Sequence, residues 1–96
     1  MNLIQTEVRT MGNGDVYQFN LPSTQCAYLF VCWGAYPNAS RCMAVIYRSN
    51  TRIKIETLGQ TSGIELSIVD SKLNVKYTYS SADSEAMCLY QLHSFV

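Results

Sequence analysis

Reactive side chains are scarce in this sequence. Its 96 residues include one histidine, His93, and seven aspartate or glutamate residues whose spacing does not indicate a paired general acid and base. Histidine is the side chain whose ordinary pKa suits proton transfer near neutral pH, and His93 follows an apolar segment instead of a catalytic motif. We therefore expect a protein that is not an enzyme.

An excess of charge of one sign is also missing. Seven Lys and Arg balance seven Asp and Glu, and the basic residues are scattered along the chain. Nucleic-acid binders concentrate positive charge on one surface, so no nucleic-acid partner is expected. The longest apolar run falls far short of the ~20 residues that cross a bilayer. MNLIQTEVRT, at the N-terminus, lacks the basic and apolar regions of a secretion signal. We expect a soluble protein without membrane insertion and without its own secretion signal.

Closely spaced cysteine pairs are absent as well. Cys26, Cys32, Cys42 and Cys88 contain no C-x₂₋₄-C spacing of a zinc site. Cys26 and Cys32 are six residues apart on one predicted strand, which places them about 20 Å from each other, too far for a disulfide. All four lie in apolar segments, where a thiol behaves as a small hydrophobe. We expect buried free thiols, no metal and no cofactor, with a disulfide as the alternative.

The sequence does contain many short segments of period-two hydrophobicity, separated by residues that favour turns. They predict about eight strands in a single domain, residues 1–96. The expected strands are Leu3–Arg9, Val16–Leu21, Cys26–Trp33, Cys42–Arg48, Arg52–Leu58, Gly63–Val69, Lys72–Tyr79 and Met87–Leu92. Asp70 and Ser71 should form a hairpin turn, and Gly12–Asp15 a second turn. A helix beginning at Asp83 or Ser84 competes with the last strand.

The strands fall into two groups by their alternation. Four have one apolar and one polar face, as antiparallel strands with a solvated side do; these are Val16–Leu21, Arg52–Leu58, Gly63–Val69 and Lys72–Tyr79. In CAYLFVCWG and CMAVIYR both parities are apolar, and in MCLYQL they nearly are, with Gln91 as the one clear exception. We therefore predict an all-β fold, an antiparallel, jelly-roll-like sandwich in which one sheet is apolar on both faces.

An exposed apolar sheet face of this size is unusual in a soluble monomer. No helix is expected that could cover it, so further copies of the chain are the predicted cover. The candidate interface residues are Cys26, Tyr28, Phe30, Cys32, Met43, Val45 and Tyr47. The alternatives are that loops fold over the face or that tyrosine hydroxyls reach water.

The loop WGAYPNASR mixes flat apolar surface with hydrogen-bonding groups. Trp33 and Tyr36 could stack on a sugar ring or a protein surface, and Asn38, Ser40 and Arg41 could donate or accept hydrogen bonds. These five residues form the candidate ligand site. The alternative is an ordinary hairpin turn with an aromatic anchor. YSSAD, Tyr79–Asp83, is a second candidate.

From Val16 onward, the order of elements resembles that of a known class of proteins. The order is an apolar strand with the LPST turn, the two strongly apolar strands, TRIKIETLGQTSGIELSIVDSKLNVKYTYSS and the final MCLYQL. It is similar to the small β-sandwich modules at the C-termini of tail-fibre, baseplate and other virion proteins of tailed bacteriophages. The resemblance implies a homotrimer with one sheet of each subunit facing the threefold axis. It also implies a rim that recognises host-surface saccharide or protein.

The expected function is therefore that of a non-catalytic structural and attachment module of a virion, made in the host cytoplasm. A stand-alone cellular carbohydrate-binding domain of the lectin type is the alternative.

Overall fold

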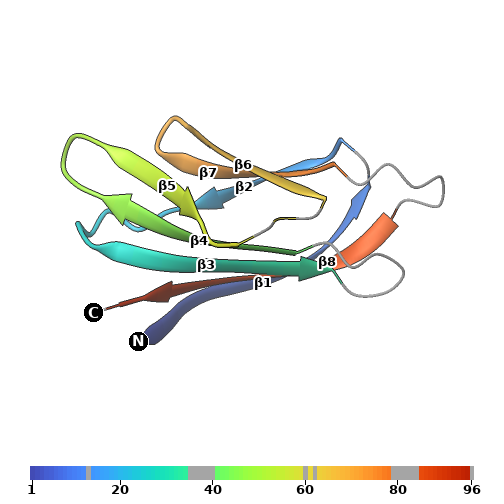
Figure 1. Ribbon diagram of the computed structural model, residues 1–96, viewed down its shortest axis with the longest axis horizontal. Coiled ribbons are helices and arrows are strands. Elements are labelled where there is room, and N and C mark those ends of the chain that lie inside the picture. Colours follow the sequence, from blue (N-terminus) through green and yellow to red (C-terminus); the bar gives the residue numbers. More distant parts are fainter. Residues whose placement is uncertain (13, 35–40, 60, 62, 79–84, 96) are drawn as a thin grey trace.

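The computed structural model describes residues 1–12, 14–34, 41–59, 61, 63–78 and 85–95, which form eight β-strands in two antiparallel sheets (Figure 1). The strands are β1 (Asn2–Gly12), β2 (Val16–Asn20), β3 (Ala27–Gly34), β4 (Arg41–Arg48), β5 (Ile53–Thr57), β6 (Ile64–Val69), β7 (Lys72–Tyr77) and β8 (Glu85–Ser94). The predicted all-β antiparallel sandwich is confirmed, and β8 takes the place of the competing helix. The described residues contain no helix that could span a membrane.

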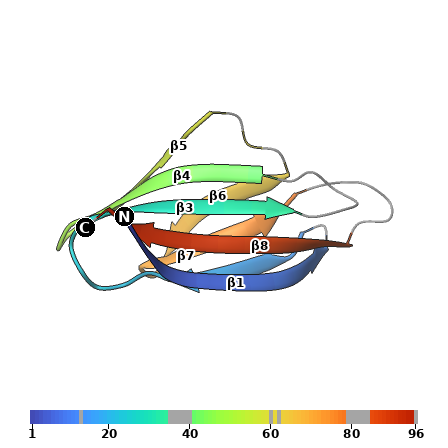
Figure 2. The same cartoon turned by 90° about the horizontal axis from the view of Figure 1, so that it is seen from below.

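The larger sheet has the strand order β1-β8-β3-β4-β5, and the smaller sheet has the order β2-β7-β6. Two antiparallel pairings are nested, β1 with β8 and β2 with β7, and these are the jelly-roll-like part of the topology. The strands β3, β4 and β5 follow one another as neighbours. Figure 2 shows β8 lying between β1 and β3, although it is the last strand along the chain.

Both predicted turns are present in the structure. Asp70 and Ser71 connect β6 to β7 with φ angles of 51° and 61°, the left-handed backbone that a two-residue type I′ hairpin requires. Between β1 and β2, the Asp15 N–H donates to the Gly12 carbonyl at 2.9 Å, and the Gly12 N–H donates to Asp15 Oδ2 at 2.7 Å. Gly14 has a φ of 87° in this turn, a conformation that glycine adopts without strain.

The core lies between the sheets and follows the period-two pattern of the strands. Its fully buried side chains include Phe19 from β2, Phe30 from β3 and Tyr90 from β8. The Phe19 and Phe30 rings meet edge to face across the two sheets, with centroids 5.6 Å apart. Aromatic side chains bury much apolar area, so this cluster supplies a large share of the hydrophobic stabilisation.

The edge strand β5 lies in a different sheet from the one that its sequence pattern predicted. It alternates Ile53 and Ile55 with Lys54 and Glu56, as the strands of the smaller sheet do, yet it pairs with β4 in the larger sheet. An edge strand borders water along its free side and on its outer face, so charged residues fit there. Grouping the strands by alternation alone was wrong for this segment.

The larger sheet has apolar side chains on both faces. We call the side turned away from the smaller sheet the outer face. Its apolar residues are Leu3, Val8, Ala27, Leu29, Val31, Trp33, Met43, Val45, Tyr47, Leu58, Met87 and Leu89. Two of the large ones, Val8 and Met87, are 54% and 55% exposed. The outer face is therefore a broad apolar surface that the described residues leave open to water.

The predicted interface set does not lie on one face. Tyr28, Phe30 and Cys32 are 0–1% exposed and point into the core. Cys26 is partly buried, with its Sγ 3.9 Å from the Ser94 Oγ. Assigning Tyr28, Phe30 and Cys32 to a subunit interface was wrong, because the core already occupies their side of β3. Cys26, just before β3, packs against the same core.

The remaining three residues of that set, Met43, Val45 and Tyr47, do lie on the outer face. In the β3–β4 ladder they are paired with Val31, Leu29 and Ala27. The outer-face residues of β3 are thus Ala27, Leu29, Val31 and Trp33, the parity opposite to the one predicted.

Candidate functional site

The ends of β3 and β4 bring together two of the five predicted ligand-binding residues. Trp33 and Arg41 are directly opposite each other in the β3–β4 ladder, and both are exposed. A cross-strand pair of this kind has its Cβ atoms roughly 4.5–5.5 Å apart. The other three predicted residues, Tyr36, Asn38 and Ser40, and the second candidate segment 79–83, lie outside the described residues.

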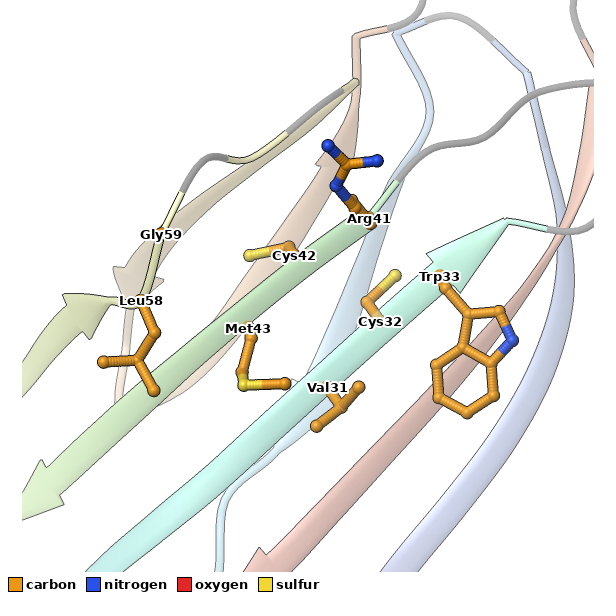
Figure 3. A pocket seen from close by; sticks show the side chains of 8 residues that line it. All are labelled: Val31, Cys32, Trp33, Arg41, Cys42, Met43, Leu58 and Gly59. Atoms are coloured by element: carbon orange, nitrogen blue, oxygen red, sulfur yellow. The ribbon is translucent and has the colours of Figure 1, made fainter.

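Beside this pair is a shallow pocket of about 450 Å³. It is lined by Val31, Cys32, Trp33, Arg41, Cys42, Met43, Leu58 and Gly59. In Figure 3 the side chains of Val31 and Met43 point toward each other from adjacent strands, and the two cysteine side chains point to the opposite side of the sheet. The floor of the pocket is therefore aliphatic, and the indole of Trp33 lies at one side of it.

Six of the eight pocket residues were not in the predicted ligand set, and three of these, Val31, Met43 and Leu58, have aliphatic side chains on the outer face. Leu58 continues β5, and its N–H donates to the Met43 carbonyl at 2.8 Å, so it occupies the outer face next to Met43. A signal for Leu58 exists in the sequence. Lys54, Glu56 and Leu58 are alternate residues on the same side of the predicted strand. The first two are charged, so the apolar Leu58 departs from their pattern.

The chemistry of this pocket suits binding. Among its lining side chains the polar groups are the indole N–H of Trp33 and the guanidinium of Arg41, and both are hydrogen-bond donors. A complementary ligand would therefore present a flat or apolar surface together with acceptor oxygens. A sugar ring or a carboxylate-bearing protein surface has these properties.

His93 lies apart from this pocket. It occupies the outer face of β8 between Leu29 of β3 and Leu3 of β1. Its Nε2 is 3.3 Å from the Gln91 Oε1 on the same strand. The described residues contain no cluster of three or more His, Cys, Asp or Glu side chains that could hold a metal ion.

The four cysteines are free thiols in the structure, as the sequence predicted. Cys32, Cys42 and Cys88 are buried on the core side of the larger sheet, at the same end of the sheet as the pocket. Cys32 is opposite Cys42 in the β3–β4 ladder. Burial raises the pKa of Cys42 from 9.0 to about 11. Burial, with the neighbouring Cys88 and Cys42 thiols, raises the pKa of Cys32 further. These thiols are protonated near neutral pH and react slowly.

Alkaline pH is expected to destabilise the fold through these thiols. The unfolded Cys42 thiol ionises near its ordinary pKa of 9.0, whereas the folded one holds its proton up to about pH 11. The folded state thus binds the proton more tightly. The contribution of the Cys42 thiol to the free energy of unfolding is therefore complete below pH 9 and is lost as the pH rises through about 11. Urea unfolding measured from pH 7 to pH 11 checks it. Cys42→Ala should show a shallower decline, and an unchanged decline would contradict this account.

A second pocket, of about 430 Å³, lies at the other end of the larger sheet. It is lined by Ile4, Pro22, Thr24, Gln25, Cys26, Tyr28 and Ser94. The Tyr28 hydroxyl donates to the Thr24 carbonyl at 2.7 Å, which ties the segment before β3 to the core. This contact assigns Tyr28 a structural role.

No protein-family model, curated protein or solved structure matches this chain.

Proposed function

We propose that this protein is a non-catalytic structural module that assembles with copies of itself through the outer face of the larger sheet. The observation that carries the proposal is the exposure of that face. Large apolar side chains from β1, β3, β4 and β8 lie on it together, several of them about half exposed. His93 and Gln91 of β8 and Lys54 and Glu56 of β5 also lie on this face. Soluble monomers nevertheless rarely expose this many large apolar side chains on one sheet face.

The contrast with the smaller sheet supports this choice of face. The outward side chains of β7 are Lys72, Asn74 and Lys76, and their neighbours on β6 include Glu65 and Ser67. That surface is mostly polar, although Val16 and Val69 also lie on it and are 50% and 41% exposed. The two sheets of one sandwich thus have opposite surfaces, and the larger sheet is the one suited to a protein contact.

The second part of the proposal is recognition at the Trp33–Arg41 end. The exposed indole and the guanidinium extend in different directions from paired strand positions (Figure 3), and each can contribute to holding a saccharide or a protein surface at the rim of an assembly. The order of strands resembles that of phage tail-fibre and baseplate modules, which supports a role in a virion that attaches to a host surface. A homotrimer is the assembly that this resemblance implies.

The mass of the protein in solution tests the proposal. One chain has a mass of 10.8 kDa, and sedimentation equilibrium at micromolar concentration should give a multiple of it. A protein that is monomeric across that concentration range would contradict the proposal, because the outer face would then be open to water.

The same Trp33–Arg41 end also favours the alternative, a cellular lectin. A glycan array separates ligand classes: saccharide binding that Trp33→Ala abolishes, in a protein of unchanged mass, would place a sugar at this pocket. Detection of the protein in purified virions would then decide between an attachment module and a cellular lectin. Binding retained by Trp33→Ala would exclude the pocket as the sugar site.

A further inference from the structure

The strand β1 forms one border of the larger sheet, and Figure 2 shows no other strand beyond it. The direction of its main-chain groups follows from the neighbouring ladders. The Phe95 N–H donates to the Ala27 carbonyl at 3.3 Å, so the odd-numbered residues of β8 direct their N–H and C=O groups toward β3. The even-numbered residues of β8 must therefore direct theirs toward β1.

The pairing of β1 with β8 then fixes which groups of β1 are free. Residues Glu7, Arg9 and Met11 are opposite even-numbered residues of β8, so their main-chain groups point into the sheet. The N–H and C=O groups of Thr6, Val8 and Thr10 point away from it. Gly12, two residues further on, agrees with this direction, because its outward N–H and C=O bond to Asp15.

The outward groups of Thr6, Val8 and Thr10 have no hydrogen-bond partner among the described residues, and all three residues are exposed. Their β-branched side chains favour an extended backbone. A row of free donors and acceptors on an exposed strand is a template for pairing with another strand.

Charges on β1 select one partner and one register. Glu7 and Arg9 lie on the face opposite to Val8, with the Arg9 Nε 3.7 Å from the Glu7 Oε1 and its guanidinium 4.4 Å from the centre of the Tyr17 ring. We propose that β1 pairs with β1 of a second copy, antiparallel about a twofold axis through Val8. This register places Glu7 of each copy opposite Arg9 of the other.

The proposed register uses both the charges and the free groups. Val8 is opposite Val8 of the partner subunit, and Thr6 is opposite the partner's Thr10, so every outward group of these residues is paired. Glu7 and Arg9 then form non-hydrogen-bonded cross-strand pairs, in which side chains are closest. An axis through Glu7 or Arg9 would instead place like charges opposite each other.

The other border of the larger sheet, β5, is the less suitable edge. It is five residues long, whereas β1 has eleven, and it lies beside β6 of the smaller sheet. A lysine on a short edge strand also opposes strand addition. Pairing through β1 joins two larger sheets into one and makes their outer faces continuous.

This contact extends the proposed self-assembly but does not depend on the outer face, because it uses main-chain groups at the sheet border. A twofold contact predicts an assembly with an even number of chains, so homotrimers joined through the outer face would pair through β1 into hexamers. Val8 also contributes its side chain to the outer face. Val8→Ala loses that side chain but keeps the N–H, so comparing it with Val8→Pro lets the two proposals fail separately.

Proline at Val8 tests the edge directly. In a single chain the Val8 N–H points to solvent, so an edge strand tolerates its loss on substitution by proline. In the proposed pair of copies, the same loss removes the central hydrogen bonds. Val8→Pro should weaken association at least about tenfold in sedimentation velocity. Gln18→Pro, at an outward position of the edge strand β2, controls for proline and should associate as the parent does. Val8→Ala controls for the lost side chain and should associate more tightly than Val8→Pro. Equal association of Val8→Pro with either control, or a parent with an odd number of chains, would overturn the proposal.

A charge-swap experiment tests the register. Glu7→Arg and Arg9→Glu should each associate weakly alone, because like charges then meet across the twofold axis. An equimolar mixture of the two variants restores opposite charges at both positions and should associate at least about tenfold more tightly than either alone. A mixture no stronger than the single variants would exclude this register, and melting curves of each variant at low concentration verify that the chains are folded.

Discussion

Phe30→Lys is expected to leave the chain unfolded or aggregated. The Phe30 side chain is fully buried, with Phe19 at 5.6 Å and Tyr90 at 6.2 Å between ring centroids. Its neighbours in the two ladders are Ala44 and Leu92, both fully buried, so a lysine ammonium would have no route to water. Removing a core phenylalanine costs about 3–5 kcal/mol, and burying an unpaired charge adds to that.

That loss is comparable to the whole stability of a domain of this size, which is about 5–15 kcal/mol. Circular dichroism and the soluble yield measure the outcome. Phe30→Leu is the matched control, because it keeps an apolar side chain of similar size and should remain folded with a loss of about 1–2 kcal/mol. A soluble, cooperatively melting Phe30→Lys protein would show that this side of β3 is not the core.

Leu29→Lys, one residue away, is expected to separate the subunits and leave each chain folded. Leu29 lies at the centre of the outer face, between Val45 of β4 and His93 of β8. In a single chain the lysine can extend into water, so the free energy of unfolding should change by less than about 1 kcal/mol. In an apolar contact between copies the same charge costs several kcal/mol.

Sedimentation equilibrium and thermal melting of Leu29→Lys distinguish these two effects. The expected result is a lower mass with a melting temperature close to that of the dissociated parent. Thr78→Lys, at an exposed position just beyond β7 in the smaller sheet, is the matched control and should keep the parent's mass. A soluble Leu29→Lys protein of unchanged mass would contradict the proposed assembly through the outer face.

The sequence pattern predicted the strands better than it predicted their partners. Each of the eight expected segments contains a strand, because alternation and turn residues act locally. The sheet to which β5 belongs depends on pairing with β4, and the pattern of Ile53, Lys54, Ile55 and Glu56 fits an edge strand of either sheet. Local periodicity contains no information about that choice.

The same limit explains the error on β3. Both parities of Ala27–Gly34 are apolar, so hydrophobicity alone could not decide which one forms the core. The structure decides through register: Val31 and Leu29 are paired with Gln91 and His93, the polar residues of β8 that mark its outer face. Those two residues indicate which parity of β8 faces outward. Which parity of β3 faces outward follows only from the register between β3 and β8, and these two strands are distant in the sequence.

The candidate ligand site was predictable only in part, because a local stretch of sequence does not show which strands pair. Trp33 and Arg41 are only eight positions apart in the sequence, so a short sequence window contains both of them. Leu58 and Gly59 reach the pocket only because β5 pairs with β4. A window around WGAYPNASR cannot include them.

The position of β8 between β1 and β3 has a consequence for biosynthesis. Until β8 has left the ribosome, β1 has no partner in its sheet and β3 has an open border, although β3, β4 and β5 can already pair with one another. Closing the larger sheet requires contacts between residues near opposite ends of the described chain, such as Asn2 with Ser94. Such distant pairings are formed slowly, on a scale of roughly milliseconds to seconds, so the apolar strands stay exposed to chaperones and to neighbouring chains until the last strand is inserted.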